Sequence, residues 1–293
     1  MSNKKHESGI AGLHRQLQRV LLLVVASVPL PALSQAVESG SFVVFNSSKN
    51  EIAVAADSRV YGLRRYSDDS CKIRAFGPNL IFAAAGQVAF FDLMGDPRLK
   101  WDVFTIAHDL FLRLSKENAS EPMPVRLANA WGEEVKNKIK LDLSFTPELV
   151  RDVAPGAVVV SAIFTGFEGK EPLMVSGYVT YSRDKRGSLD TTFIVAQKVR
   201  QPALAMIGET AIGEEFGEQQ TLRAKQWMGS IPFSADPVAT KAISVVQFAE
   251  KYSPIVQRGG IKYADIAGPI DAVRIIRPMG IEWVQRKQNC PKD

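Results

Sequence analysis

The chain has 293 residues, of which 46% are hydrophobic and 23% are charged, an ordinary composition for a globular protein with a buried core. The formal net charge is +5, and the first forty residues hold four Lys or Arg against two Glu, which leaves +3 for the rest. Because this charge is small and not gathered in a block of Lys and Arg, it argues against nucleic acid as a partner.

Histidine and cysteine are scarce, which excludes a Cys/His zinc site because such a site needs four ligands at regular spacing. Two of the three His lie in the first forty residues, so a Ser-His-Asp triad would have to use His108. That residue falls in Trp101–Lys116, whose apolar spacing predicts a helix, and we expect His108 on the helix surface. Whether Cys71 and Cys290 form a disulfide stays open at this point.

The N-terminal residues have the tripartite pattern of a secretory signal peptide. Residues 1–19 are polar with a net positive charge, Val20–Ala26 is an apolar run, and small residues precede a cut after Ala36. Residues 1–36 are therefore predicted to be a signal peptide, and the protein is predicted to be exported, periplasmic or secreted. The apolar run is too short for a comfortable membrane span, so no stable span is expected after leader removal; an uncleaved anchor is the alternative.

The first part of the remaining chain alternates short apolar strands with turns, and helical spacing follows. Two hairpins are indicated, the second around the turn Gly77-Pro78-Asn79. The expected strands are Ser41–Ser47, Glu51–Asp57, Cys71–Phe76 and Leu80–Ala85, and the expected helices are Gln87–Met94, Trp101–Lys116 and Val125–Leu141.

The second part repeats this order of strands, helices and strands. The expected strands are Gly156–Phe167, Pro172–Ser182, Thr191–Gln197 and Ala203–Gly208, then the helices Glu209–Lys225 and Asp236–Tyr252, and finally the strands Ile270–Arg277 and Ile281–Val284. Hairpins are plentiful and the strand-helix alternation of a parallel sheet is missing. This clustering favours an α+β protein with two antiparallel sheets packed together and helices outside.

Four short motifs, one at an end of each of the first four expected strands, point to a catalytic site. Gly40-Ser41 opens that strand, Ala55-Ala56-Asp57-Ser58-Arg59 ends the second, Lys72-Ile73 opens the third, and Ala83-Ala84-Ala85-Gly86 ends the fourth. Asp57 lies sixteen residues after Ser41, and Gly86 lies fourteen residues after Lys72. In order and spacing these motifs resemble the proteasome β-subunit-like N-terminal nucleophile hydrolase family. The clear resemblance covers Gly40–Gly86.

The resemblance implies a four-layer αββα sandwich and an active site on Ser41. A serine hydroxyl needs a base, and with no usable His the free α-amine of Ser41 would serve, since its pKa of about 7.7–8.0 leaves much of it neutral near pH 8. That amine exists only if the Gly40–Ser41 bond is cut. Residues 37–40 would then be a short propeptide, and residues 41–293 a single domain.

The resemblance also assigns the other roles. Lys72 would lower the pKa values of the hydroxyl and amine, Asp57 would pair with Lys72, and the Gly86 backbone N–H would donate to the oxyanion. Two further positions are less determined. Glu209 would accept from the amine or cap the next helix. Asp265, in Asp265-Ile266-Ala267-Gly268 before the last strands, would line the site.

The function expected from the sequence is an exported, self-processed hydrolase of amide or peptide bonds, with a peptide or small-amide substrate and no cofactor. A homo-oligomer, a smaller assembly or a monomer are all compatible with the sequence. The alternative is a catalytically inactive scaffold or binding protein on the same fold.

Overall fold

The computed structural model describes residues 41–61, 66–68, 70–90, 101–145, 155–184, 188–208, 210–216, 221–232, 234–258 and 261–291. Contacts divide the chain into two units, Met1–Ser34 and Gln35–Asp293, and every described residue belongs to the second. The predicted signal peptide, the propeptide with Gly40, and Glu209 lie outside the described residues. The domain boundaries at residues 36 and 40 therefore stay predictions.

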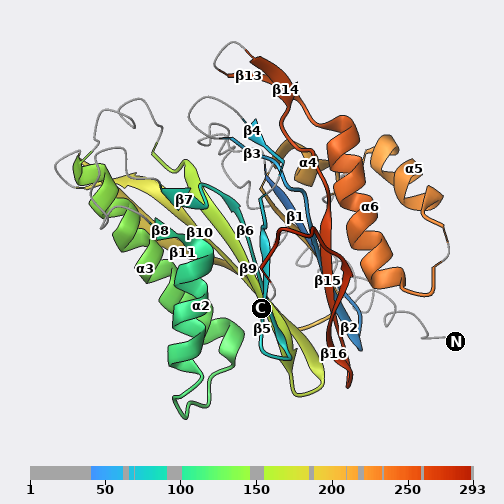
Figure 1. Ribbon diagram of the computed structural model, residues 1–293, viewed down its shortest axis with the longest axis horizontal. Helices are drawn as coiled ribbons and strands as arrows, with labels where there is room; N and C mark the ends of the chain where they lie inside the picture. Colours follow the sequence, from blue (N-terminus) through green and yellow to red (C-terminus); the bar gives the residue numbers. More distant parts are fainter. Residues whose placement is uncertain are drawn as a thin grey trace, which may run out of the picture. The chain divides into compact units, whose positions relative to one another are not determined.

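Two five-stranded sheets form the centre of this unit (Figure 1). The first sheet has the order β12 (Leu204–Gly208), β1 (Phe42–Ser47), β2 (Glu51–Ala56), β15 (Asp271–Ile276) and β16 (Gly280–Gln285). The second has the order β11 (Leu189–Val199), β10 (Glu171–Arg183), β9 (Val158–Glu168), β6 (Leu80–Gly86) and β5 (Ile73–Phe76). All neighbouring strands in the two sheets are antiparallel.

Short two-stranded ladders lie beside these sheets. They join β3 (Val60–Tyr61) to β4 (Tyr66–Ser67), β7 (Ala89–Phe90) to β8 (Trp101–Asp102), and β13 (Ile255–Arg258) to β14 (Ile261–Ala264).

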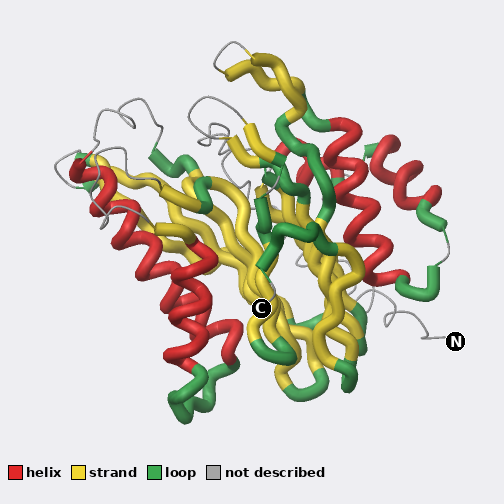
Figure 2. Tube along the Cα trace, viewed as in Figure 1, coloured by secondary structure: helices red, strands yellow, loops and turns green. Residues whose placement is uncertain are grey.

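Helices cover the outer face of each sheet, as Figures 1 and 2 show. The second sheet is covered by α2 (Val103–Leu114) and α3 (Met123–Phe145). The first is covered by α6 (Pro237–Tyr252), with α5 (Leu222–Ser230) packed beside it and α4 (Thr210–Glu215) following β12. The expected α+β class and four-layer αββα sandwich of two antiparallel sheets are thereby confirmed.

Side chains of the central strands alternate between two cores, which explains why these strands read as unbroken apolar runs. In β1, Phe42 and Val44 face the core under α6, whereas Val43 and Phe45 face the core between the sheets. The same alternation in β6 sends Phe82 toward α2 and α3. Because these strands are buried on both faces, the residues at their ends are held in fixed positions.

Two of the expected helices are wrong. In Gln87–Met94, residues Ala89–Phe90 form β7, since their backbone pairs with Trp101–Asp102; the last four residues lie outside the described part. In Glu209–Lys225, α4 and α5 are separate helices. Thr221 has an extended backbone and its hydroxyl accepts from the backbone N–H of Ala224, so it caps a new helix instead of continuing the old one.

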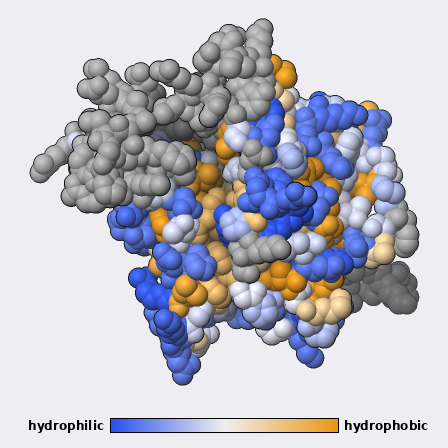
Figure 3. All heavy atoms as spheres, viewed as in Figure 1, coloured by the Kyte–Doolittle hydropathy of each residue, from blue (hydrophilic) through white to orange (hydrophobic). Residues whose placement is uncertain are grey.

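The surface seen in Figure 3 has hydrophilic side chains beside smaller apolar areas. Met279 in the turn between β15 and β16, Leu222 in α5 and Ile255 in β13 are more than 60% exposed, and such single apolar side chains are ordinary on a protein surface. None of the helices in the described part of the chain combines the length and apolar character that crossing a bilayer requires.

Candidate active site

Ser41 lies immediately before β1 and is fully buried. Its Oγ has no hydrogen-bond partner among the described residues. Gly208, at the end of β12, pairs with Phe42 and has a φ of +108°. A Cβ at position 208 would lie 1.8 Å from the Ser41 carbonyl O, so only glycine lets the β12 backbone come this close.

Asp57 follows β2 and connects the serine to a lysine. Its Oδ1 accepts from the Phe42 backbone N–H at 2.7 Å and from Lys72 Nζ at 2.7 Å. Its Oδ2 accepts from the Arg59 backbone N–H at 3.0 Å. Because Phe42 N is bonded to the carbonyl carbon of Ser41, the serine and the lysine lie on either side of one carboxylate oxygen.

Lys72 precedes β5 and has a fully buried side chain, like Asp57. Its Nζ also donates to the Arg59 carbonyl O at 2.6 Å, and the Ala84 backbone N–H donates to the Lys72 carbonyl at 3.1 Å. The bond from Ala84 ties the Lys72 backbone to β6. The two acceptors, on Asp57 and Arg59, hold its ammonium in place.

Burial disfavours both charges of this pair. Burial lowers the pKa of the Lys72 ammonium, while the Asp57 carboxylate raises it, Lys287 lowers it further and Asp265 raises it. Burial raises the pKa of the Asp57 carboxyl, while Lys72 and the backbone N–H groups of Phe42 and Arg59 lower it. The ion pair therefore depends on its hydrogen bonds to stay charged.

Gly86 ends β6 opposite Val160, with a φ of +103°. A Cβ at position 86 would lie 2.5 Å from the Val159 carbonyl O, so packing against β9 already requires glycine. The oxyanion role expected for its N–H stays a prediction.

Asp265 follows β14, and 4% of its surface is exposed. Its backbone N–H donates to the Pro254 carbonyl O at 3.0 Å, which holds the turn against the end of α6. Its negative charge raises the pKa of Lys72. The structure therefore brings Asp265 into the same group of charges as Asp57 and Lys72.

Sequence reasoning missed several residues that surround this group. Arg59 forms a bidentate pair with Asp68, with Nε–Oδ1 at 2.6 Å and Nη2–Oδ2 at 2.7 Å. Glu250 on α6 has a buried Oε1 without a hydrogen-bond partner in the described part of the chain. Burial raises the pKa of Glu250 to about 7, and the Asp57 carboxylate raises it too. Arg59 belongs to a quoted motif, but Glu250 has no signal in the local sequence.

The C-terminal segment also reaches the site, through a disulfide that joins Cys71 to Cys290 with a Cα–Cα distance of 5.6 Å. Cys71 is the neighbour of Lys72. The question that the sequence left open is thus answered by a cross-link at the site itself.

His108 has no part in this group. It lies on α2 with 54% of its side chain exposed, beside Asp109 and against the ring of Phe76. Among the described residues no cluster of His, Cys, Asp and Glu is suited to hold a metal ion. The position of His108 on α2 therefore excludes it as the base of a Ser-His-Asp site on Ser41.

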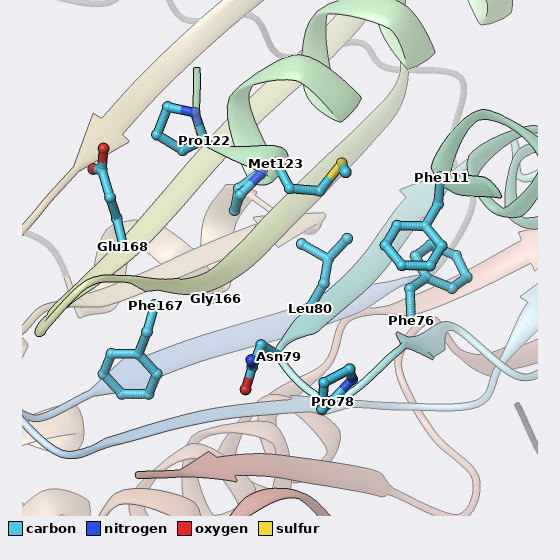
Figure 4. Close-up of a pocket in the computed structure, with 11 residues that line it drawn as sticks. Phe76, Pro78, Asn79, Leu80, Phe111, Pro122, Met123, Gly166, Phe167 and Glu168 are labelled. Atoms are coloured by element: carbon cyan, nitrogen blue, oxygen red, sulfur yellow. The ribbon is translucent and has the colours of Figure 1, made fainter. Parts of the chain in front are cut away.

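An apolar pocket of about 280 Å³ lies at the other end of β5 and β6. Figure 4 shows its lining, in which Phe76, Leu80, Phe111, Met123 and Phe167 predominate. β6 has seven residues, and at about 3.3 Å per residue the pocket is roughly 20 Å from Gly86. The pocket and the Ser41 group are separate features.

No family model matches this chain, and no curated protein matches it. Solved structures similar to this chain include Anbu proteins. They include the helical assembly of the Anbu complex from Pseudomonas aeruginosa, with 13% identity, coverage of 85% of this chain and 88% of that chain, and a TM-score of 0.49. Anbu (ancestral beta-subunit) from Yersinia bercovieri has 16% identity, coverage of 85% and 88%, and a TM-score of 0.46. The Anbu (Gly-1) mutant from Hyphomicrobium sp. strain MC1 has 16% identity, coverage of 84% and 86%, and a TM-score of 0.45.

These comparisons correct the family assignment made from the sequence. The expected proteasome β-subunit-like N-terminal nucleophile hydrolase family is wrong, because the similar structures are Anbu proteins and neither a family model nor a curated relative supports it. The described residues between Ser41 and Gly86 form short strands joined by turns, and such a pattern specifies a local hairpin geometry much better than a family. Any function must be argued from this chain's own residues.

Proposed function

We propose that this chain hydrolyses an amide or peptide bond, with the Ser41 hydroxyl as nucleophile and the Ser41 α-amine as base, once the Gly40–Ser41 bond has been cut. One observation carries the proposal. A single carboxylate oxygen of Asp57 accepts from both Phe42 N–H and Lys72 Nζ, next to a buried serine hydroxyl that has no partner in the described residues.

The reaction would proceed in two balanced steps. The Ser41 Oγ attacks the substrate carbonyl carbon while the hydroxyl proton passes to the α-amine. The C–N bond then breaks, the leaving amine takes that proton, and an ester on Ser41 remains. Water attacks this ester with its proton moving to the α-amine, and the acid product leaves as the hydroxyl is restored.

The surrounding residues supply charge and position. The Lys72 ammonium favours the deprotonated hydroxyl and the neutral amine, and Asp57 keeps that ammonium aimed. The N–H of Gly86 is the proposed donor to the oxyanion, a contribution of about 2.7–4 kcal/mol in comparable sites. Asp265 is proposed to line the site and to balance the charge of Lys72.

Processing would control the chemistry. In the unprocessed chain Ser41 is fully buried and its nitrogen belongs to a peptide bond. The base would therefore arise only from the cut. Export through the leader and assembly into a homo-oligomer remain proposals that are independent of this chemistry.

The test is turnover of peptide amides together with covalent labelling. The processed wild type should hydrolyse a fluorogenic peptide amide, and a β-lactone should add its mass to the peptide that begins with Ser41. Ser41→Ala should lower kcat/KM by about 10⁴-fold or more and should not be labelled. Ser47→Ala, at the other end of β1, is the matched control and should retain turnover.

A scaffold or binding protein is the competing function, favoured by the full burial of Ser41. It would be supported by folded wild type that neither turns over peptide amides or small amides nor accepts the lactone. Turnover of small amides alone would keep the proposed chemistry and change the substrate class.

A further inference from the structure

Lys287 lies after β16 and is nearly buried, with 7% of its side chain exposed. Its Nζ is 2.8 Å from Asp271 Oδ2, and its backbone N–H donates to Asp271 Oδ1 at 2.9 Å. The same Nζ donates to Ser58 Oγ and to the Ser70 carbonyl O. One buried ammonium thus has acceptors on three separate segments.

Two of these segments carry the buried ion pair. Ser58 directly follows Asp57, and Ser70 stands two residues before Lys72. The Ser70 backbone N–H donates to the Ser58 carbonyl O at 3.2 Å. Lys287 therefore bridges the two stretches of backbone that position the carboxylate and the ammonium.

The disulfide fixes this arrangement. Cys290, three residues after Lys287, is bonded to Cys71, the neighbour of Lys72. The Cys290 backbone N–H donates to the Lys287 carbonyl O at 3.3 Å. The turn that carries Lys287 is consequently tied to the residue next to Lys72.

Charged residues surround Lys72 on several segments. They are Asp57 and Arg59 after β2, Asp68 after β4, Asp265 after β14 and Lys287 after β16, and on α6 Glu250 has its pKa raised by Asp57. Lys287 lowers the pKa of Lys72, whereas Asp57 and Asp265 raise it. Among these groups Lys287 is a like charge held in place by its own carboxylate, Asp271.

We propose that Lys287 is a positioning residue for Ser41-dependent hydrolysis, holding the Asp57 and Lys72 segments together and adding a second positive charge to the site. The inference rests on the proposed function. Lys287 does not touch the reacting atoms, and it acts through Lys72 and Asp57.

The experiment compares pH profiles of kcat/KM for a peptide amide. Lys287→Gln removes the positive charge and keeps a hydrogen-bond donor beside Asp271, and Lys287→Arg keeps the charge. Loss of the positive charge raises the pKa values of the α-amine and of Lys72, so both limbs of the profile should move to higher pH by about half a unit to one unit. At a fixed pH on the acidic limb, this shift lowers kcat/KM by about three- to tenfold. Lys287→Arg should have the same limbs as the wild type.

A purely structural role would lower kcat/KM at all pH values without moving the limbs, and that result overturns the inference. Lys287→Met takes the place of Lys287→Gln if the latter does not fold, and Lys287→Met combined with Asp271→Asn, which removes both charges of the pair, should leave the limbs near their wild-type positions. NMR titration of the Lys72 ammonium, assigned with Lys72→Arg, provides a readout independent of turnover and should show a higher pKa in Lys287→Gln.

Wild type that shows no Ser41-dependent turnover would remove the proposed function and this inference together. Unmoved limbs in an active enzyme would remove the inference alone.

Discussion

The two ends of β5 and β6 differ sharply in chemistry although the same strands connect them. At one end Lys72 precedes β5 and Gly86 ends β6, and the ion pair of Lys72 with Asp57 is fully buried there. At the other end Phe76 ends β5 and Leu80 begins β6, and the lining is apolar. Several hydrophobic residue types of similar volume can supply apolar packing, whereas buried ions cost free energy unless each is paired. The proposed chemistry belongs to the charged end, whereas we expect the apolar end to contribute to stability alone.

The largest expected effect comes from breaking the buried pair. Lys72→Met leaves the Asp57 carboxylate without its cation, which should cost about 3–5 kcal/mol of unfolding free energy and abolish turnover. Adding Asp57→Asn should recover part of the stability but no turnover. Urea denaturation and peptide-amide hydrolysis measure the two quantities. A double variant as unstable as the single one would show that the unpaired charge is not what destabilises Lys72→Met.

The matching change at the apolar end is Leu80→Ala. Leu80 is 4% exposed and belongs to the core under α2 and α3. Its truncation should cost about 2–5 kcal/mol and leave kcat/KM per folded molecule unchanged. Urea denaturation and active-site titration check this prediction, and a fall in kcat/KM comparable to that of Lys72→Met would abolish the division between the two ends.

The disulfide can be removed with Cys71→Ser and Cys290→Ser together. The cross-link joins residues that are 219 positions apart, and its loss should lower stability by about 2–4 kcal/mol. Reduction of the wild type should shift the urea midpoint equally. An unchanged midpoint in both experiments would mean that the C-terminal turn is held by its hydrogen bonds alone.

The smallest effect concerns Glu250, because burial raises the pKa of its carboxyl from the ordinary 4.5 to about 7. Between these values the folded state holds a proton that the unfolded state has lost, so stability falls as pH rises through this window. Glu250→Gln should therefore match wild type at pH 4 and be more stable above pH 7, by on the order of 1 kcal/mol after solvent screening. Thermal melts from pH 4 to pH 8 test this; a difference independent of pH would contradict it.

The sequence predicts the fold well where local pattern and packing agree. Val43 and Phe42 belong to an unbroken apolar run because both faces of β1 are buried, and such runs are visible without a structure. The helix predicted from Gln87 onward is wrong because Ala89 and Phe90 pair with Asp102 and Trp101 in a short β-ladder. A two-residue bridge of that kind leaves no periodic signal.

The site was predictable only in part. Ser41, Asp57 and Lys72 lie within one stretch of chain whose hairpins bring them together. Lys287 reaches Ser58 across 229 residues, and Glu250 approaches Asp57 from a helix on the outer face, so their roles depend on tertiary packing. The oxyanion role expected of Gly86 stays a prediction, because the close approach of β9 already requires glycine at this position.

The most direct test is the first residue of the processed protein. Mass spectrometry of the N-terminal peptide should find Ser41 first in the wild type, while Ser41→Ala should keep the bond between positions 40 and 41 intact. An active wild type that begins at Val37, or that retains the leader, would lack a free amine on Ser41 and would contradict the proposed chemistry.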